Sequence, residues 1–416
     1  MNKTAPGMME NGKMVPVEQV QRLGLDPVSL VKTVHKIEDL RESPLNIVTA
    51  ECVMDSSFTQ NKFKNQLLKK KKKYVMGVGV YRQLWWDTSR NKKVLRPIRP
   101  TFNQIYRPYI GQDLNGKTLL CTRTGGIGDL LFILPNLTYL KKKYPDSKII
   151  FACGPQYHAM VNKWDCIDKV FDLPFPMIEA QKADYHAVFE GVIERCKEAH
   201  TVNAYHLFTR WLGLNLPDEL LVPRQYADYS LLEKCQDLLD ASWKINKFII
   251  LQMRASSPVR TPDPKVWINL INKLTTNGHK IVITDNPHIV KGIDKFIETL
   301  DHPGSVFNFA KYSETLDWTI AMTKLASCAV CTDSALVHIA ASLDTPVFGL
   351  YCPFPADIRL STYKKTDSIG SDIECSPCFT HGMNVCKNNT DGYPNCYNKI
   401  DIDEAVKRIE RLLEGE

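Results

Sequence analysis

The chain has 416 residues, of which 44% are hydrophobic and 24% are charged. This length exceeds that of an ordinary single domain, so the sequence predicts two domains with room for an extension. There is no apolar run of the roughly 18 residues that a transmembrane helix needs, and the first residues lack the apolar segment of a secretory signal. We therefore expect a cytoplasmic protein, in the host cytoplasm if the gene is viral, without a transmembrane segment.

Positive charge is concentrated near the N-terminus. Residues 1–117 hold 21 basic and 10 acidic side chains, a net charge of +11, so the remaining residues carry −4. This basic extension includes an unbroken lysine run, Lys69–Lys73. Such charge suits an anionic partner such as DNA, but a solvated surface without a partner explains it equally. The neighbouring rings suit either base stacking or core packing: Tyr74, Tyr81, Trp85 and Trp86.

Residues 1–116 form an N-terminal extension that differs from the rest of the chain. The pattern predicts a helix near Val17–Leu40 and a strand over Tyr74–Trp86. The connector Arg96–Tyr109 contains prolines at positions 97, 100 and 108. Because proline lacks a backbone donor, this connector is not expected to form a regular helix or a central strand.

From Lys117 onward, short apolar strands alternate with helices in two successive copies. The predicted strands are Thr118–Thr122, Lys148–Cys153, Lys169–Leu173, Ala187–Phe189, Phe248–Gln252, Lys280–Thr284, Ala329–Thr332 and Val347–Leu350. The predicted helices include Leu130–Lys143, Val266–Thr276, Thr315–Leu325, Leu336–Ser342 and Asp401–Leu413. This alternation is typical of doubly wound parallel sheets. It predicts an α/β protein with two Rossmann-like lobes facing a cleft, over residues 117–235 and 236–416, with a hinge in Pro217–Trp243.

A glycine-rich turn follows the first of these strands. Gly125, Gly126 and Gly128 precede a helix, and Asp129 stands at the junction. Glycines permit close approach of the backbone to a ligand, and the free N–H groups of a helix N-terminus attract anions. The spacing fits neither a dinucleotide fingerprint nor a P-loop. From this turn alone, Asp129 is either a functional carboxylate or a simple helix cap.

A second turn, CTDSALVH, joins the strand Ala329–Thr332 to a helix. Small and hydroxyl residues at such a helix start can bind phosphate; the candidates here are Thr332, Asp333, Ser334 and Ala335. His338 lies one turn into the helix and can reach the same site. The alternative is that Asp333 and Ser334 cap the helix and that His338 is a buried, hydrogen-bonded histidine.

Together the two turns resemble glycosyltransferase family 9, the ADP-heptose:lipopolysaccharide heptosyltransferase-like family of the GT-B superfamily. The segment TGGIGDLLFILPNLTYLKKKYPDSKIIF is similar to the family's opening, and TDSALVHIAASLDTPVFGLYCP is similar to its donor-binding segment. The resemblance covers residues 117–414 and leaves out 1–116. Ala335 replaces a glycine of the family, and Cys352 replaces the glycine of its terminal Gly-Pro, so the identity of the nucleotide is open.

The resemblance implies sugar transfer from a nucleotide-activated, ADP-heptose-like donor to a saccharide or lipid-linked saccharide hydroxyl, with inversion and without an essential metal. Asp129 matches the family's catalytic base, which takes the acceptor's proton, and residues 332–338 match its phosphate-contacting segment. Arg260 is our candidate for the cation that holds the diphosphate, with Arg254 as its competitor, because arginine can bind two phosphate oxygens. A glycosyltransferase of hydroxymethylated bases in DNA and a non-catalytic sugar-nucleotide-binding protein are the alternatives.

Four of the thirteen cysteines cluster near the C-terminus: Cys375, Cys378, Cys386 and Cys396. Four thiolates at such a spacing can hold a structural, tetrahedral Zn²⁺, with His381 as a substitute ligand. Reduced thiols without a metal are the second interpretation. Disulfides are the third, which a reducing compartment disfavours. A similar cysteine-containing tail occurs in many members of the family that the chain resembles.

Overall fold

The computed structural model describes residues 8–10, 13–15, 35–37, 47–60, 64–77, 81, 84, 86–87, 92–98, 102–243, 247–380 and 386–415. The chain divides into two compact units. The first consists of Met1–Gly125, Asn136–Ala199 and Tyr205–Leu216, and the second of Gly126–Pro135, His200–Ala204 and Pro217–Glu416. Among the described residues, no helix combines the length and the hydrophobicity needed to cross a membrane.

The first unit contains a parallel four-stranded sheet in the order β12-β11-β10-β14. Its strands are β10 (Thr118–Thr122), β11 (Lys148–Cys153), β12 (Lys169–Asp172) and β14 (Tyr185–Val188). The central strand β10 buries Leu119, Leu120 and Cys121 completely, as expected for a strand covered on both faces. The helix α4 (Ile127–Lys143) follows β10 directly, so the strand–turn–helix predicted around Gly125–Asp129 is confirmed.

The N-terminal extension contributes an antiparallel sheet to the same unit. Its order is β13-β6-β3-β9, formed by β3 (Ile47–Cys52), β6 (Lys73–Gly77), β9 (Leu95–Pro97) and β13 (Phe175–Pro176). Because β13 lies beyond residue 117, the extension and the α/β part share one sheet. They also share a core, in which Ile47, Val75 and Phe102 pack with Leu120 and Ile150.

Several expectations for the extension need correction. The strand predicted over Tyr74–Trp86 ends at Gly77, and Trp86 belongs to a separate two-residue strand, β7 (Trp86–Asp87), paired with β8 (Lys92–Lys93). A single helical turn, α3 (Phe102–Ile105), forms in the proline-rich connector, where its four residues fit between Pro100 and Pro108. The remaining strands are β1 (Met8–Glu10), β2 (Lys13–Val15), β4 (Ser56–Gln60) and β5 (Lys64–Leu68). The helix predicted near Val17–Leu40 lies outside the described residues, apart from 35–37.

The aromatic side chains of the extension serve its core. Tyr74 and Tyr81 are 7% and 4% exposed and pack with Met76 and Leu95, so they cannot stack on bases. Trp85 lies outside the described residues. The five lysines of Lys69–Lys73 are exposed, and the backbone at Lys71 turns with a φ of 64°. Lys69–Lys72 therefore form a solvated turn, and Lys73 begins β6 beside a buried ring.

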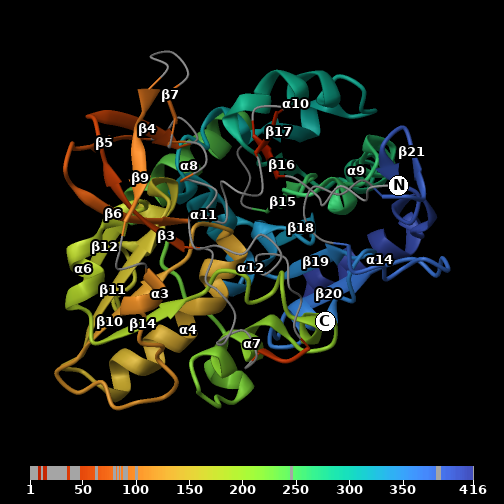
Figure 1. The fold of residues 1–416 in the computed structure, drawn as a ribbon. Coiled ribbons are helices and arrows are strands. Elements are labelled where there is room, and N and C mark those ends of the chain that lie inside the picture. Colours follow the sequence, from red (N-terminus) through yellow and green to blue (C-terminus); the bar gives the residue numbers. More distant parts are fainter. Residues whose placement is uncertain are drawn as a thin grey trace, which may run out of the picture. The chain divides into compact units, whose positions relative to one another are not determined.

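The second unit contains a parallel six-stranded sheet in the order β17-β16-β15-β18-β19-β20 (Figure 1). Its strands are β15 (Ile249–Gln252), β16 (Ile281–Ile283), β17 (Val306–Asn308), β18 (Cys328–Thr332), β19 (Val347–Leu350) and β20 (Thr366–Ile369). Its main helices are α8 (Tyr229–Ser242), α9 (Pro264–Thr276), α10 (Val290–Ile297), α11 (Leu316–Leu325), α12 (Ala335–Ser342) and α14 (Ile402–Glu414). Two parallel α/β sheets confirm the predicted fold class.

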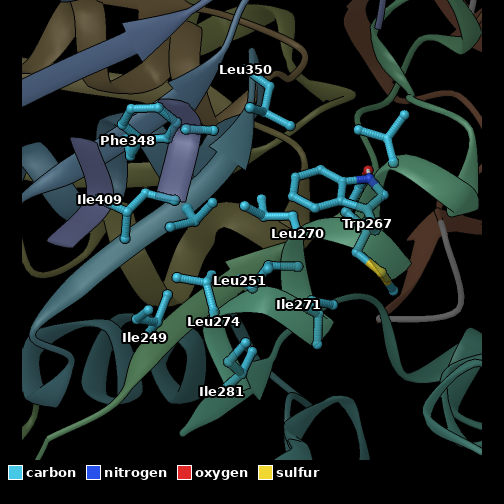
Figure 2. Close-up of a cluster of buried hydrophobic side chains, with 14 of the residues drawn as sticks. Ile249, Leu251, Trp267, Leu270, Ile271, Leu274, Ile281, Phe348, Leu350 and Ile409 are labelled. Atoms are coloured by element: carbon cyan, nitrogen blue, oxygen red, sulfur yellow. Dashed lines mark hydrogen bonds between the residues drawn. The ribbon is translucent and has the colours of Figure 1, made fainter. Parts of the chain in front are cut away.

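The core of the second unit forms where α9 and α14 pack on the sheet. Figure 2 shows Trp267, Leu270 and Leu274 of α9 beside Leu251 of β15, and Ile409 of α14 beside Phe348 of β19. The indole N–H of Trp267 donates to the backbone oxygen of Met253 at 3.0 Å, so the ring is buried without an unpaired donor. These apolar contacts hold the ends of the strands that carry the candidate site.

The segment Pro217–Trp243, expected to be a hinge, is largely helical. It contains α8, whose N-terminus is capped by Asp228 accepting from the amide of Ser230 at 3.0 Å. This helix packs against α11 within the second unit. Within α8, Cys235 and Leu239 are fully buried, whereas Leu231, Leu232 and Leu238 are partly exposed.

Candidate active site

Asp129 lies in the first turn of α4, immediately after the glycine-rich turn. Gly126 has a φ of 88°, a conformation that side chains rarely adopt. A Cβ at Gly126 would also overlap the carboxylate of Asp129. The carboxylate therefore folds back over the turn, and glycine at 126 is needed both for the backbone conformation and for the space.

The two predicted motifs meet in the second unit. A Cβ at Gly128 would lie 2.9 Å from Cδ2 of His338, which is closer than real side-chain contacts allow. The ring of Phe132, one turn further along α4, meets the ring of His338 edge to face with centroids 4.6 Å apart. The structure therefore places the Asp129-bearing turn directly against α12.

His338 is a buried and neutral histidine. Its side chain is 3% exposed, and its Nδ1 shares a hydrogen bond of 2.8 Å with the hydroxyl of Tyr363. Burial lowers the pKa of His338 to about 3; Asp333 opposes this shift, while Arg359 and Arg260 add to it. The ring therefore carries no charge at neutral pH and cannot attract phosphate as a cation.

Asp333 anchors two arginines at the carboxyl end of β18. The Nη1 of Arg260 donates to the backbone oxygen of Asp333 at 2.9 Å and to its Oδ2 at 3.2 Å, and the Nε of Arg359 lies 3.9 Å from Oδ1. Burial by itself raises the pKa of Asp333, but Arg260, Arg359 and His338 outweigh it and hold that pKa below its usual range. The carboxylate is thus ionised and positions Arg260.

The start of α12 offers unused polar groups. The side chain of Ser334, the residue that precedes the helix, does not cap it, because its hydroxyl donates to Oε1 of Gln252 at 2.8 Å. The buried hydroxyls of Thr332 and Tyr351, at the ends of β18 and β19, have no hydrogen-bond partner in the described part of the chain. Free helix N–H groups beside a cation form an anion site.

The structure distinguishes the two candidate arginines. Arg254 follows β15 and pairs with Asp285 after β16, with its Nε 3.1 Å and its Nη2 3.2 Å from the two carboxylate oxygens. Its side chain is 46% exposed. Arg260, in contrast, contacts Asp333 and donates from Nη2 to the hydroxyl of Ser256 at 3.1 Å. Arg260, not Arg254, therefore belongs to the start of α12.

Sequence reasoning missed the groups in the first unit that hold the segment before Gly126. Arg123 is 4% exposed; its Nε donates to the oxygen of Gly125 at 2.9 Å, and its Nη2 to Glu194 at 2.7 Å. Glu190 accepts from the amide of Thr124 and, at 3.0 Å, from its hydroxyl. Burial raises the pKa of Glu190, while Arg123 and Thr124 oppose the shift. Neither residue lies in a recognisable motif.

The clustered cysteines do not assemble the predicted zinc centre in the part of the chain that the structure describes, where no group of three metal-binding side chains comes together. Cys375 and Cys378 are exposed, whereas Cys396 is buried and its pKa is raised by a hydrogen bond with Cys352. Burial raises the pKa of Cys386, and the nearby thiols of Cys396, Cys378 and Cys375 raise it further. The thiols thus lie near one another without metal-ligand geometry, and His381 lies outside the described residues.

Comparison with known proteins finds one similar family. The family model "Glycosyltransferase family 9 (heptosyltransferase)" matches residues 191–387, a little under half of the chain. No curated protein sequence matches the chain.

Solved structures show the fold. A family 9 glycosyltransferase from Veillonella parvula is 13% identical, with a TM-score of 0.57 over 73% of this chain and 99% of that one. Heptosyltransferase II of Escherichia coli, an ADP-heptose lipopolysaccharide enzyme, is 15% identical, with a TM-score of 0.56 over 72% of this chain and 99% of that one. The iron-containing dodecameric glycosyltransferase TibC of enterotoxigenic E. coli is 11% identical, with a TM-score of 0.51 over 92% of this chain and 98% of that one.

The fold and the match together define the chain as a glycosyltransferase, an enzyme of the GT-B class. Over residues 191–387 the chain is similar to glycosyltransferase family 9, the heptosyltransferase family. The likeness to TibC covers more of the chain than residues 117–416. The extension, which the sequence suggested to be foreign to the bacterial enzymes, therefore shares part of its fold with one of them.

Proposed function

We propose that this enzyme transfers a heptose-like sugar from an ADP-activated donor to a saccharide hydroxyl, with inversion and without a catalytic metal. The observation that carries the proposal is the contact between the Asp129-bearing turn and α12, which combines a carboxylate with an anion-binding helix start in one unit. The fold shared with E. coli heptosyltransferase II, named for ADP-heptose, supports the choice of donor.

The donor diphosphate binds at the start of α12 in this proposal. The backbone N–H groups of Ser334 and Ala335 and the helix N-terminus supply partial positive charge. Arg260 supplies a full charge, and Asp333 fixes its direction from behind. The hydroxyl of Thr332 lies at the same strand end. Because His338 is neutral, its contribution to donor binding is positional and not ionic.

Asp129 acts as the general base. Its carboxylate accepts the proton of the acceptor hydroxyl while the acceptor oxygen bonds to the anomeric carbon of the sugar. The bond between that carbon and the diphosphate oxygen breaks in the same displacement, which inverts the configuration and releases ADP. The positive groups around Arg260 stabilise the charge that develops on the departing diphosphate.

The acceptor in this proposal is a saccharide. A saccharide hydroxyl is favoured by the lipopolysaccharide named for the E. coli enzyme of the same fold. Burial of Tyr74 and Tyr81 removes two rings that would have served a nucleic-acid track, and no contact within the described residues favours DNA as the acceptor. The lobes at 117–235 and 236–416, the cytoplasmic location and the structural metal at the cysteines remain predictions.

ADP release from ADP-heptose, with and without a saccharide acceptor, tests the function. We expect release by the wild type and none above background from UDP-glucose. ADP alone should raise the melting temperature, because a ligand that binds only the folded state stabilises it. Failure of both ADP and ADP-heptose to stabilise the protein would exclude the proposed donor.

A further inference from the structure

The imidazole of His338 is enclosed by groups from distant parts of the sequence. Its Cδ2 edge faces Gly128, and the ring of Phe132 lies edge-on against it at 4.6 Å. Its Nδ1 shares the 2.8 Å hydrogen bond with Tyr363. One side of the ring therefore contacts the Asp129-bearing turn, and the opposite side is fixed by a hydroxyl.

Tyr363 is held in place independently of both motifs. It follows the short helix α13 (Asp357–Leu360) and precedes β20. Its amide donates to the oxygen of Leu360 at 2.8 Å, and its side chain is 8% exposed. Its ring meets that of His338 at a centroid distance of 6.0 Å and an angle of 62°. A buried hydroxyl on such a support can set the rotation of the imidazole.

The close approach of α4 to His338 depends on the absence of a side chain at Gly128. Because Gly128 has no Cβ, its backbone reaches the imidazole edge. Asp129 is the next residue, so a displacement of the ring reaches the carboxylate through one peptide unit. The neutral state of His338 leaves packing and hydrogen bonding as the means by which it acts here.

We propose that Tyr363 and His338 form a buried positioning pair that holds the Asp129-bearing turn of α4 at a fixed place relative to the start of α12. The roles of Asp129 and α12 rest on the proposed function, whereas the packing relationship does not. Proton transfer requires the base within hydrogen-bond reach of the hydroxyl, and small misplacements of catalytic groups lower the rate much more than they weaken binding. Tyr363 is therefore a positioning residue that acts through His338 and Gly128.

Tyr363→Phe tests the pair with the loss of one hydroxyl. We expect amide hydrogen exchange in residues 126–132 to accelerate about tenfold, because a lost hydrogen bond favours local opening. We also expect ADP release from ADP-heptose to fall about tenfold in kcat, with the donor KM and the ADP-induced thermal shift unchanged. Tyr312→Phe is the matched control, since this ring stacks on Phe307 and Phe309 in the same unit and lies outside the site.

A double-substitution cycle tests the contact itself. Gly128→Ala places a methyl against the imidazole and should accelerate exchange in residues 126–132, whereas His338→Asn removes the ring edge and retains an amide near Tyr363. If the contact is direct, Gly128→Ala should have a smaller effect on exchange in the His338→Asn background. Additive effects, or unchanged exchange in Tyr363→Phe, would overturn the proposal. Exchange is measured without substrate, so a wild type inactive on ADP-heptose would refute the proposed function and leave this test decisive.

Discussion

Arg260 donates through one nitrogen to both the backbone oxygen and the carboxylate of Asp333, at 2.9 and 3.2 Å. Its side chain remains 24% exposed, while that of Asp333 is 4% exposed. The acid therefore fixes the guanidinium from the buried side and leaves part of it open to solvent. This arrangement suits an arginine that binds an anion arriving from outside.

Arg260→Ala should weaken ADP binding by about tenfold to a hundredfold, the loss expected for a charge-assisted contact to phosphate. Arg254→Ala is the matched control, because Arg254 pairs with Asp285 instead. Isothermal titration with ADP measures both. Equal losses of ADP affinity in the two variants would contradict the assignment of Arg260 as the diphosphate-binding arginine. Since removal of Arg260 leaves the buried Asp333 with Arg359, the melting temperature of each variant must be measured as well.

Asp129→Asn should preserve the fold and ADP affinity and reduce turnover by roughly 10²–10⁴, the range for loss of a general base. The amide has nearly the same shape, so the close approach to Gly126 is retained. Initial rates of ADP release from ADP-heptose provide the measurement. A rate within a few-fold of the wild type would remove Asp129 from the mechanism.

Burial of His338 predicts that the folded protein loses stability as the pH is lowered. Its pKa in the folded state is about 3, compared with an ordinary value of 6.5, so between these values the unfolded chain binds the extra proton. The free energy of unfolding should therefore fall as the pH is lowered through this window, by at most about 1.4 kcal/mol per pH unit for this one group. Urea denaturation from pH 7 to pH 4 should show a weaker dependence in His338→Asn. An identical dependence in both proteins would show that this histidine does not contribute.

Deletion of residues 1–116 should lower stability severely, because it removes β6 from its pairing with β13 and exposes Leu120 and Ile150. Changing Lys69–Lys73 to glutamine should leave the melting temperature nearly unchanged, since exposed substitutions shift stability by about 0.5 kcal/mol or less. Thermal denaturation of both variants distinguishes a structural extension from a removable one. A truncated chain with the same melting temperature as the wild type would contradict the shared core.

The cysteine segment is tested by elemental analysis of protein purified without chelator. The spacing predicts about one zinc ion per chain if four thiolates hold it. Cys235→Ser is the control, because Cys235 is buried in α8 and lies outside the predicted ligand set. Absence of metal, together with reactive Cys375 and Cys378 in the folded protein, would reject the site and agree with their exposure.

Local sequence by itself determined the α/β class and the positions of the turns. Strands such as β10, β11 and β19 have the predicted bounds, because short apolar runs between polar turns specify buried parallel strands. The glycines and the acid of the first motif, and the polar residues of the second, followed from their places after strands. Edge elements such as β17 and β20 were missed, since short half-buried strands lack a strong apolar signal.

Only the tertiary structure decided which residues meet. Nothing local indicates that Gly128 lies against His338, that Arg260 and not Arg254 reaches Asp333, or that Glu190 holds Thr124. Each of these contacts joins segments far apart in the chain, and each depends on how the strands are ordered in their sheets. Periodicity reports which face of an element is buried. The partner on that face is selected by packing and by the pairing of buried charges, which act only once the chain has folded.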